Sequence, residues 1–349
     1  HRLLPSGPTD DMLRLILHRL GQTVLVLMIV SVVVFGLIRL TPGDPVDIFL
    51  GEQTVTADQR EAYRRDLGLD RPILVQYLDF AWRAVQGDLG HSILQRTSVS
   101  ALTWNAFLAT FELTIAGLLI GVVIGVPTAL LAALNHGKLT DRLSSSIALL
   151  GISIPTFWLG IMMILVLSLG LGLFPTGDRI AAGMAPQRIT GLMTVDSLLT
   201  GNLPAFLQSL SYLALPAFSI GVALSASVMQ VLRGSLIAVK EEEFVYALRS
   251  RGLGRSAIYR HMLRNAAPPT VIIMGVKLGS LLGGAIVTES VFSWPGLGFL
   301  VVEGIRARDY PLVQGAVLFM AVVFVLVSLI TDIIQLCLDP RIRHGEDAR

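Results

Sequence analysis

The feature that most constrains this chain is a series of long stretches with almost no charged side chain. Six such stretches follow one another, at residues 20–38, 113–134, 143–177, 197–232, 266–288 and 310–331. The only charged side chain inside them is Lys277. A hydrocarbon core of roughly 30 Å is crossed by about 20 apolar residues in a helix. The sequence therefore predicts an all-α integral membrane protein with six transmembrane helices.

Composition supports a bilayer as the solvent. The 349 residues are 53% hydrophobic and only 15% charged, whereas soluble domains carry about 25% charged residues. A net charge of +2 argues against a protein that binds nucleic acid. The single cysteine, Cys337, excludes an internal disulfide framework. The six histidines are scattered without the spacing of metal ligands, so the sequence predicts no metal site.

The distribution of basic residues predicts the orientation in the membrane. The connection between the fourth and fifth stretches is the most basic: Arg233, Lys240, Arg249, Arg251, Arg255, Arg260 and Arg264. The same side receives further basic residues from residues 135–146 and from the tail: Lys138, Arg142, Arg341, Arg343 and Arg349. The opposite side has few: Arg179, Arg188, Arg306 and Arg308. Both termini are therefore expected in the cytoplasm.

The chain divides into five parts by composition. Residues 1–11 are polar and precede the first methionine, so we interpret them as a flexible extension or a remnant of cloning. Residues 12–40 form the first transmembrane helix, 41–110 an ordered extracytoplasmic cap, 111–338 a five-helix core with a cytoplasmic loop at 233–267, and 339–349 a cytoplasmic tail. In the cap, Thr56 with Gln59 fits a capping box and predicts a helix at 57–67. Pro72 predicts a second helix that continues to about Val85.

Two predicted spans carry glycines at a spacing of four, which places each trio on one helix face. The trios are Gly117, Gly121 and Gly125, and Gly275, Gly279 and Gly283. Missing side chains let helix backbones approach closely, either for static packing or for sliding during gating. Pro127 and Pro155 are expected to kink their helices.

Lys277 lies about two turns inside the fifth span. A cation at the bilayer centre costs about 2.5–3.5 kcal/mol on insertion scales, so it is expected to face protein or water. Asp332 and Glu289 are the candidate ion-pair partners. A contact between Lys277 and the transported substrate is the alternative.

The basic connection contains a short amphipathic helix that can bind a partner. Phe244, Ala247 and Leu248 form one apolar stripe, and Gly252 occupies the position of a left-handed terminating residue. Glu243 and the two preceding glutamates suit the positive end of the helix dipole. A helix this short is unstable alone, so we expect it to dock in a groove of a partner protein. A helix lying on the membrane surface is the simpler alternative.

This segment resembles the EAA loop of ATP-binding-cassette importer permeases, the coupling helix that binds the ATPase subunit. The resemblance assigns this role to Glu243, Phe244, Val245, Tyr246, Ala247, Leu248, Arg249 and Gly252. Matches to the dipeptide/oligopeptide/nickel permease family extend along the chain. They include Pro42-Gly43-Asp44-Pro45, Leu67-Gly68-Leu69-Asp70-Arg71-Pro72, Gly87-Asp88-Leu89-Gly90, the run from Glu289 to Gly298, Arg308-Asp309-Tyr310-Pro311 and Asp339-Pro340-Arg341.

The resemblance implies a permease of the type I importer fold in a bacterial inner membrane. It implies four partner proteins: a homologous second permease, two cytoplasmic ATP-binding subunits and an extracytoplasmic substrate-binding protein. The sequence contains no phosphate-binding loop, so ATP and magnesium are expected on the ATPase subunits, and this chain is expected to hold no cofactor and no catalytic residue. The pore or outer-gate candidates are Lys277, Glu289, Phe292 and Trp294. The turn at Trp294-Pro295-Gly296 either shapes the gate or is only a tight turn.

A peptide is the expected substrate, and a nickel chelate, glutathione or an opine is the alternative within the family. A second hypothesis is a stand-alone secondary transporter with Lys277, Glu289 and Asp332 as an ion relay, although the two halves show no clear internal repeat. A third is a membrane scaffold that only docks partners. The cap is expected either to meet the binding protein or to seal the permease pair.

Overall fold

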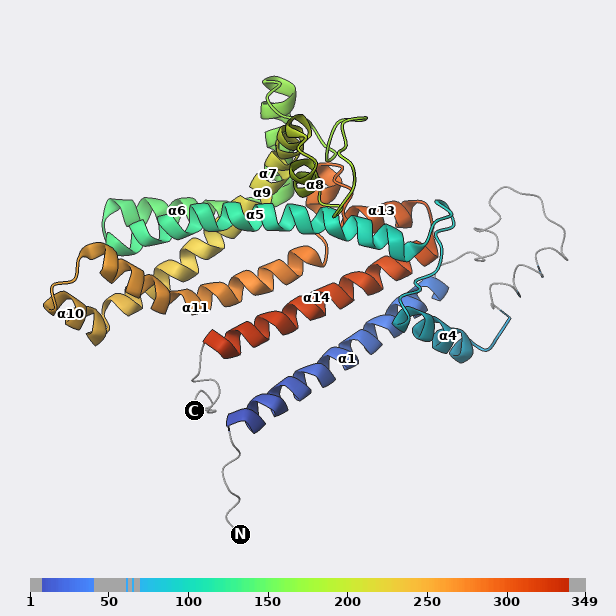
Figure 1. Ribbon diagram of the computed structural model, residues 1–349, viewed down its shortest axis with the longest axis horizontal. Helices are drawn as coiled ribbons and strands as arrows, with labels where there is room; N and C mark the ends of the chain where they lie inside the picture. The colour runs from blue at the N-terminus through green and yellow to red at the C-terminus, as the bar shows by residue number, and fades with distance from the viewer. Residues whose placement is uncertain (1–7, 41–60, 62–64, 66–69, 339–349) are drawn as a thin grey trace, which may run out of the picture.

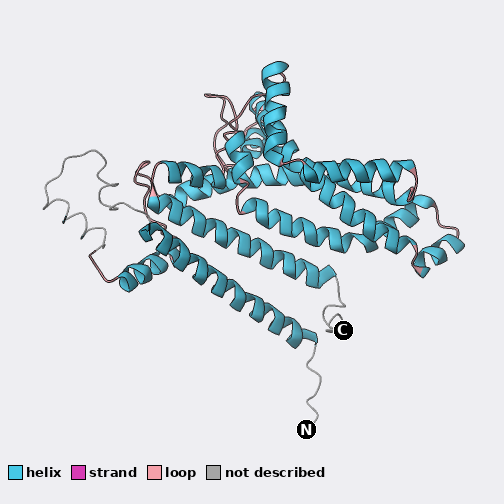
Figure 2. Cartoon of the chain, turned by 180° about the vertical axis from the view of Figure 1, so that it is seen from behind, coloured by secondary structure: helices cyan, strands magenta, loops and turns pink. Residues whose placement is uncertain are grey.

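The computed structural model describes residues 8–40, 61, 65 and 70–338. The predicted helix at 57–67 and the two terminal segments of the sequence analysis lie largely outside these residues. In the described part of the chain the secondary structure is helical, apart from an isolated antiparallel bridge between His91 and Ser98. Figures 1 and 2 show an elongated bundle of long helices.

The long helices run roughly along the same axis (Figure 1). They are α1 (Pro8–Leu40), α5 (Val99–Leu134), α9 (Leu203–Lys240), α11 (Arg255–Leu282) and α14 (Tyr310–Leu338). Helix α14 packs against both α1 and α11, and α11 packs against α9. Short helices occupy the two ends: α10 (Glu243–Ser250) lies at one end, and α4 (Ile73–Val85) and α13 (Leu297–Arg306) lie at the other. The predicted second cap helix is confirmed as α4, and the helix expected from residue 113 begins at Val99, inside the range assigned to the cap.

Helices α5 and α9 form the most extensive pair, and the first glycine trio makes their contact possible. Gly117, Gly121 and Gly125 are buried on one face of α5. A Cβ atom at Gly121 would lie 2.7 Å from the Cβ of Leu224, and one at Gly125 would lie 2.8 Å from the Cβ of Val228. These distances are shorter than van der Waals contact, so side chains at these positions would push the two helices apart.

The second glycine trio does not lie on one helix. Gly275 and Gly279 are in α11 and face α14, where a Cβ atom at Gly275 would collide with the side chain of Thr331. Gly283 lies beyond the last helical residue, and Gly284 then adopts φ +121°, which ends the helix. The prediction that Gly283 shares the stripe is therefore wrong, because the chain turns before that position.

Helix α11 also begins much earlier than the predicted span. It starts at Arg255 and continues through Pro268 and Pro269, which the sequence analysis placed at the end of the loop. Each proline removes only its own backbone donor. Ala266 and Thr270 beside them are buried, so packing against the neighbouring helices holds this stretch in helical form. The basic loop and the fifth span are therefore one continuous element.

The third predicted span is broken rather than only kinked. Helices α6 (Leu139–Ser153) and α7 (Thr156–Met163) flank Pro155, and the axis of α6 makes an angle of 93° with the helical segment that follows and continues as η1 (Ile164–Gly170). Pro155 was expected to kink this span, and its missing N–H accounts for the break.

Helices occur at all six predicted stretches, but not all of them qualify as spans by length and hydropathy. Among the described residues, α5, α9 and residues 310–335 of α14 are long and apolar enough to cross a membrane, and the bent pair raises this number to four. Helix α1 contains a shorter apolar part, at 21–36. The count of six remains a prediction.

Candidate functional site

Helix α10 (Glu243–Ser250) connects α9 to α11 at one end of the bundle (Figure 1). Glu242 is its N-cap residue and Glu243 is in its first turn, where carboxylates favour the positive end of the helix dipole. After the last turn, Gly252 has φ +75°. This left-handed conformation favours glycine, as the sequence analysis expected at this position.

The inner face of α10 packs on its own chain. Val245 is fully buried in a cluster that includes Leu236, Ile258 and Met262. The cluster therefore joins α10 to α9 and α11, so a displacement of α10 moves apolar contacts on both helices.

The predicted apolar stripe of α10 does not face outward as a unit. Phe244 and Leu248 are half-buried against the same cluster, and only Ala247 of the stripe is exposed. The prediction is wrong for the first two side chains because the short helix needs them, together with Val245, to hold its own position. The stripe serves intramolecular packing, and a partner meets a different face.

The outer face of α10 is a mixed surface formed by Glu243, Tyr246, Ala247, Arg249 and Ser250, all of which are exposed. We call these five residues the α10 face. Tyr246 is 55% exposed, and the guanidinium carbon of Arg249 lies 5.8 Å from the centroid of its ring. The α10 face combines a carboxylate, an aromatic ring, a cation and a small residue, which suits a protein groove better than hydrocarbon.

An ion pair fixes the base of this end. Asp141 at the start of α6 is buried and binds Arg233 of α9 through two bonds, Nε to Oδ1 at 2.5 Å and a terminal nitrogen to Oδ2 at 2.8 Å. The backbone N–H of Gly137 donates to the same carboxylate at 2.9 Å, and His136 Nδ1 lies 3.0 Å from it. The sequence analysis counted Arg233 only as a basic flank. No local spacing could reveal the pair, because its two members are 92 positions apart.

At the opposite end, a buried carboxylate joins α5 to the long loop before α9. Glu112 of α5 pairs with Arg179 and accepts hydrogen bonds from the backbone N–H and the hydroxyl of Thr194, at 2.7 and 2.6 Å. The guanidinium carbon of Arg179 lies 5.6 Å from the ring centroid of Trp294. Glu112 thus holds the N-terminus of α8 (Met193–Leu199) on the bundle.

A second buried carboxylate organises the turn between α12 (Ile286–Val291) and α13. Glu289 is fully buried and accepts a hydrogen bond from the hydroxyl of Thr110 at 2.6 Å and from the backbone N–H of Phe299 at 3.0 Å. The backbone N–H of Leu297 donates to the Thr110 hydroxyl at 2.8 Å. A side chain at Gly296 would collide with the Glu289 carboxylate. Only glycine leaves room for this arrangement.

Phe292 and Trp294 are buried in the interior of the chain and do not face an opening. Each is 1% exposed. The indole N–H of Trp294 donates to the carbonyl of Ala109 at 2.9 Å, and the ring packs with Leu113 and Ile220. For the run at Trp294-Pro295-Gly296, this packing favours the tight turn over the gate, which were the two alternatives of the sequence analysis.

Lys277 is exposed on α11 and has neither of its expected partners. Asp332 instead pairs with Arg19 at 3.3 Å, and Glu289 makes the hydrogen bonds described above. Among the described residues, no salt bridge involves Lys277. The prediction of an intramolecular pair is wrong, because α11 turns this side chain away from α14 and from the buried turn.

The loop before α8 has its own carboxylate anchor. Asp196 accepts hydrogen bonds from the backbone N–H groups of Ile189, Thr190 and Gly191 and from the Thr190 hydroxyl, at 2.6–3.2 Å. Burial alone raises the pKa of Asp196, but these hydrogen bonds together lower it below its ordinary value of 3.8. The carboxylate therefore stays ionised and holds the loop at neutral pH.

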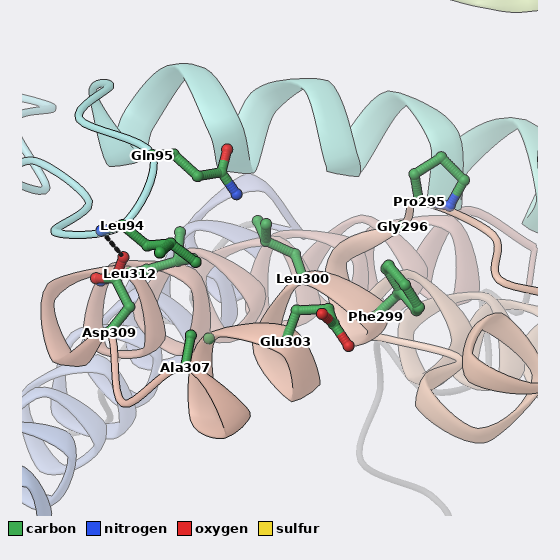
Figure 3. Close-up of a pocket in the computed structure, with 11 residues that line it drawn as sticks. Leu94, Gln95, Pro295, Gly296, Phe299, Leu300, Glu303, Ala307, Asp309 and Leu312 are labelled. Atoms are coloured by element: carbon green, nitrogen blue, oxygen red, sulfur yellow. Dashed lines mark hydrogen bonds between the residues drawn. The ribbon is translucent and has the colours of Figure 1, made fainter. Parts of the chain in front are cut away.

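A shallow cavity of about 330 Å³ lies beside α13 (Figure 3). Leu94 and Gln95 border it on one side, and Phe299 and Glu303 of α13 border it on another. Asp309 at its edge accepts a hydrogen bond from the backbone N–H of Leu94 at 3.1 Å. In the described part of the chain no group of three or more histidine, cysteine or acidic residues could hold a metal ion.

Comparison with known protein families matches nearly the whole chain. Residues 125–344 match the model described as the inner membrane component of binding-protein-dependent transport systems. Residues 12–113 match the N-terminal model of the corresponding membrane component.

Curated relatives align along the full length. The Dipeptide transport system permease protein DppB of Escherichia coli (strain K12) is 36% identical over 337 residues, which covers 95% of this chain and 99% of the relative. The Glutathione transport system permease protein GsiC of Escherichia coli O6:H1 is 35% identical over 334 residues, with 95% and 100% covered.

A solved structure of the MetNI methionine ABC transporter in inward facing conformations resembles this chain with a TM-score of 0.51. The two are 17% identical in sequence, and the likeness covers 68% of this chain and 96% of that chain. At this identity the likeness concerns the fold, which for this chain is the all-helical fold of a type I importer permease.

Proposed function

The chain belongs to the family of inner membrane components of binding-protein-dependent transport systems, and on this premise we propose that it is a peptide-translocating permease subunit of an ATP-binding-cassette importer. The curated relative named for dipeptide transport supports a peptide substrate. The relative named for glutathione transport keeps that tripeptide as the alternative. In this proposal the chain performs no chemistry and provides part of the path across the membrane.

The observation that carries the proposal is the construction of α10. A short helix is seated on the bundle by Val245 while Tyr246 and Ala247 remain exposed on its outer face. A motor subunit that binds the α10 face pushes directly on α9 and α11, because the Val245 cluster includes residues of both helices. The α10 end is then the cytoplasmic end, as the basic residues around it also favour.

The proposed mechanism is alternating access by rigid-body motion. Two ATP-binding subunits hold ATP and magnesium and move α10 when they close. The ion pair between Asp141 and Arg233 makes α6 follow α9. Since the glycine contact between α5 and α9 leaves no room for side chains, these two helices are expected to move as one body. The other helices contact a homologous second permease, with which this chain would form the path.

The remaining assignments extend this proposal. The six helices cross the inner membrane with both termini in the cytoplasm, and the α13 end faces the substrate-binding protein. The buried carboxylates Glu112 and Glu289 keep that end rigid, so it offers a fixed platform. Residues 41–98 form the extracytoplasmic cap.

Replacement of Ala247 tests the function directly. The transporter with all of its subunits is reconstituted in vesicles, and peptide uptake and ATP hydrolysis are both measured. Ala247→Asp is expected to lower uptake at least about tenfold, because an unpaired carboxylate buried in a docked interface costs several kcal/mol. Thr140→Asp is the matched control, since Thr140 is exposed at the same end on α6 and outside the α10 face.

The control is expected to transport peptides normally. Normal uptake by Ala247→Asp at normal protein levels would contradict the proposed role of α10. Uptake by the purified chain alone, driven by an ion gradient without ATPase subunits, would instead support the secondary transporter. Mass spectrometry of the ligand retained by the cognate binding protein distinguishes a dipeptide from glutathione, an opine or a nickel chelate.

Lys277 is proposed to line the translocation path. It is exposed on a helix whose other faces pack against α9 and α14, and the two intramolecular partners are occupied elsewhere. Within α11, Ser280 is exposed close to it, one helical turn on, so the free face is partly polar. An exposed cation within a span faces water or protein rather than lipid.

Lys277→Met is expected to lower peptide uptake several-fold while Lys277→Arg retains most of it, because only the second variant keeps the charge. Both variants are first shown to assemble with the ATPase subunits. Equal uptake by Lys277→Met and the unmodified protein would remove Lys277 from the path.

A further inference from the structure

Helix α4 (Ile73–Val85) has three distinct faces, although none of its residues is fully buried. Its position beside the C-terminal end of α1 is visible in Figures 1 and 2. One face contacts α1, the next is apolar and exposed, and the third is polar. At 100° per residue each face occupies roughly a third or less of the helix circumference.

The first face packs on α1 through aromatic contacts. The rings of Tyr77 and Phe80 lie 5.3 and 5.9 Å from the ring of Phe35. The Tyr77 hydroxyl is 2.9 Å from the hydroxyl of Ser31, which itself donates to the carbonyl of Met28. These contacts fix both the position and the rotation of α4 relative to α1.

The contacts also give the depth of α4. Ser31 lies inside the apolar stretch of α1 at 21–36, about 10 Å along the helix axis from the end of the charge-free run at residue 38. Phe35 lies roughly 5 Å from that end. Helices that lie in a membrane interface are buried about 5–10 Å into the boundary between headgroups and acyl chains. A helix held at Ser31 and Phe35 therefore lies at interfacial depth if α1 crosses the bilayer.

The second face is apolar and uncovered. Leu74, Leu78, Trp82 and Val85 follow a helical stripe and are 57–81% exposed. This stripe is adjacent to the α1 contact face, and α1 itself exposes apolar side chains beside that contact, including Val32 and Val33. The apolar surfaces of the two helices are thus continuous. Tryptophan at the edge of such a surface is typical of membrane–water interfaces.

The third face carries the polar side chains. Gln76, Asp79 and Arg83 follow one another at helical spacing on the side opposite to the exposed apolar stripe and the α1 contact. Asp79 accepts a hydrogen bond from Arg71 at 2.9 Å, which closes the start of the helix. A protein groove would leave no reason for polar groups to gather on one side, whereas a bilayer interface separates the two faces by solvent.

We propose that α4 is an interfacial helix that inserts the stripe of Leu74, Leu78, Trp82 and Val85 into the lipid leaflet at the α13 end, with Arg83 near the lipid phosphates. The occupant of this surface is the bilayer itself. The inference does not depend on the peptide substrate or on the role of α10, since it needs only that α1 crosses the membrane.

Site-directed spin labelling tests the proposal in the complete transporter. Cys337→Ser removes the native thiol, and single cysteines replace Leu78, Trp82 or Arg83 before labelling with a nitroxide. The labelled transporter is reconstituted in phosphatidylcholine vesicles, and its ATP hydrolysis verifies assembly. Collision of each label with oxygen, which concentrates in lipid, is compared with collision with a water-soluble nickel chelate.

Labels at 78 and 82 are expected to show a several-fold higher ratio of oxygen to nickel accessibility than the matched label at 83. High nickel accessibility at all three positions would overturn the proposal, because the stripe would then face water. Low accessibility to both reagents at 78 and 82 would also overturn it and would assign the stripe to a protein contact, either the second permease or the binding protein. Using two positions on the stripe ensures that a defect caused by one substitution does not decide the result.

Discussion

Helix α10 is held on the bundle by apolar contacts, whereas the turn before α13 at the opposite end is held by buried carboxylates. Val245 with two half-buried neighbours seats α10. Glu112 and Glu289 bind their surroundings through ion-pair and hydrogen-bond contacts with defined geometry. Apolar burial is non-directional, but a hydrogen bond weakens steeply when its angle changes. The first end can therefore tilt with little loss of contact, and the second cannot.

This difference matches the proposed division of labour. A subunit that moves α10 needs a seat that tolerates small rotations. A binding protein that delivers a ligand needs a surface that keeps its shape. The ion pair between Asp141 and Arg233 is directional, but it joins α6 to α9 and does not include α10 itself. The comparison can be broken by changes at either end.

The largest expected effect is at the carboxylate end. Glu112→Ala leaves Arg179 buried without its counter-charge, and removal of one partner from a buried pair costs about 3–5 kcal/mol. The unfolding free energy of the detergent-solubilised protein, measured by denaturant titration, is expected to fall by this amount. Glu303→Ala is the control, since its pair with Arg306 is exposed and worth about 0–1 kcal/mol. Equal losses in both variants would remove the contrast between the two ends.

A smaller effect is expected at the α10 end. Val245→Ala removes two buried methyl groups, which costs about 2 kcal/mol including the cavity. Its consequence should be mainly local, with faster amide hydrogen exchange in α10 and weaker coupling of ATP hydrolysis to uptake. Ser250→Ala on the exposed side of the same helix is the matched control. A protected α10 in Val245→Ala would mean that this side chain is not what seats the helix.

The smallest effect concerns pH and the loop held by Asp196. Because the pKa of Asp196 is lowered in the folded protein, its stabilising contribution is complete above the ordinary value of 3.8 and is lost as pH falls below it. The difference in thermal midpoint between the unmodified protein and Asp196→Asn should therefore be constant near neutral pH. It should shrink below pH 3.8. A difference that grows with acidification would reverse the sign and contradict the assigned hydrogen bonds.

Local chemistry made several elements predictable. The helix after Pro72, the break at Pro155 and the left-handed Gly252 follow from backbone properties of the residues involved, and all were located correctly. The glycine trio of α5 was recognisable because its spacing matches one helix face. The trio of α11 failed at Gly283, since nothing local to that glycine announces where tertiary packing lets the helix end.

The site could be predicted only in outline. The position of α10 and its exposed Ala247 agree with the sequence analysis, but Phe244 and Leu248 turned inward. Amphipathicity reveals that a short helix has an apolar face, and it does not reveal whether that face meets a partner or the same chain. Glu289 was singled out as an acid near the membrane, yet its partner Thr110 lies 179 positions away and carries no distinguishing signal.

The sequence by itself determined the class of this protein: charge-free runs of membrane length, basic connections on one side and ordered family motifs specify a helical inner membrane permease. Only the tertiary structure decided which side chains pair, with Asp141 bound to Arg233, Glu112 to Arg179, and Lys277 without an ion partner among the described residues. The physical reason is range. Hydropathy and backbone preference act over a few residues, whereas a buried charge is satisfied by whatever group the fold brings within about 3 Å of it.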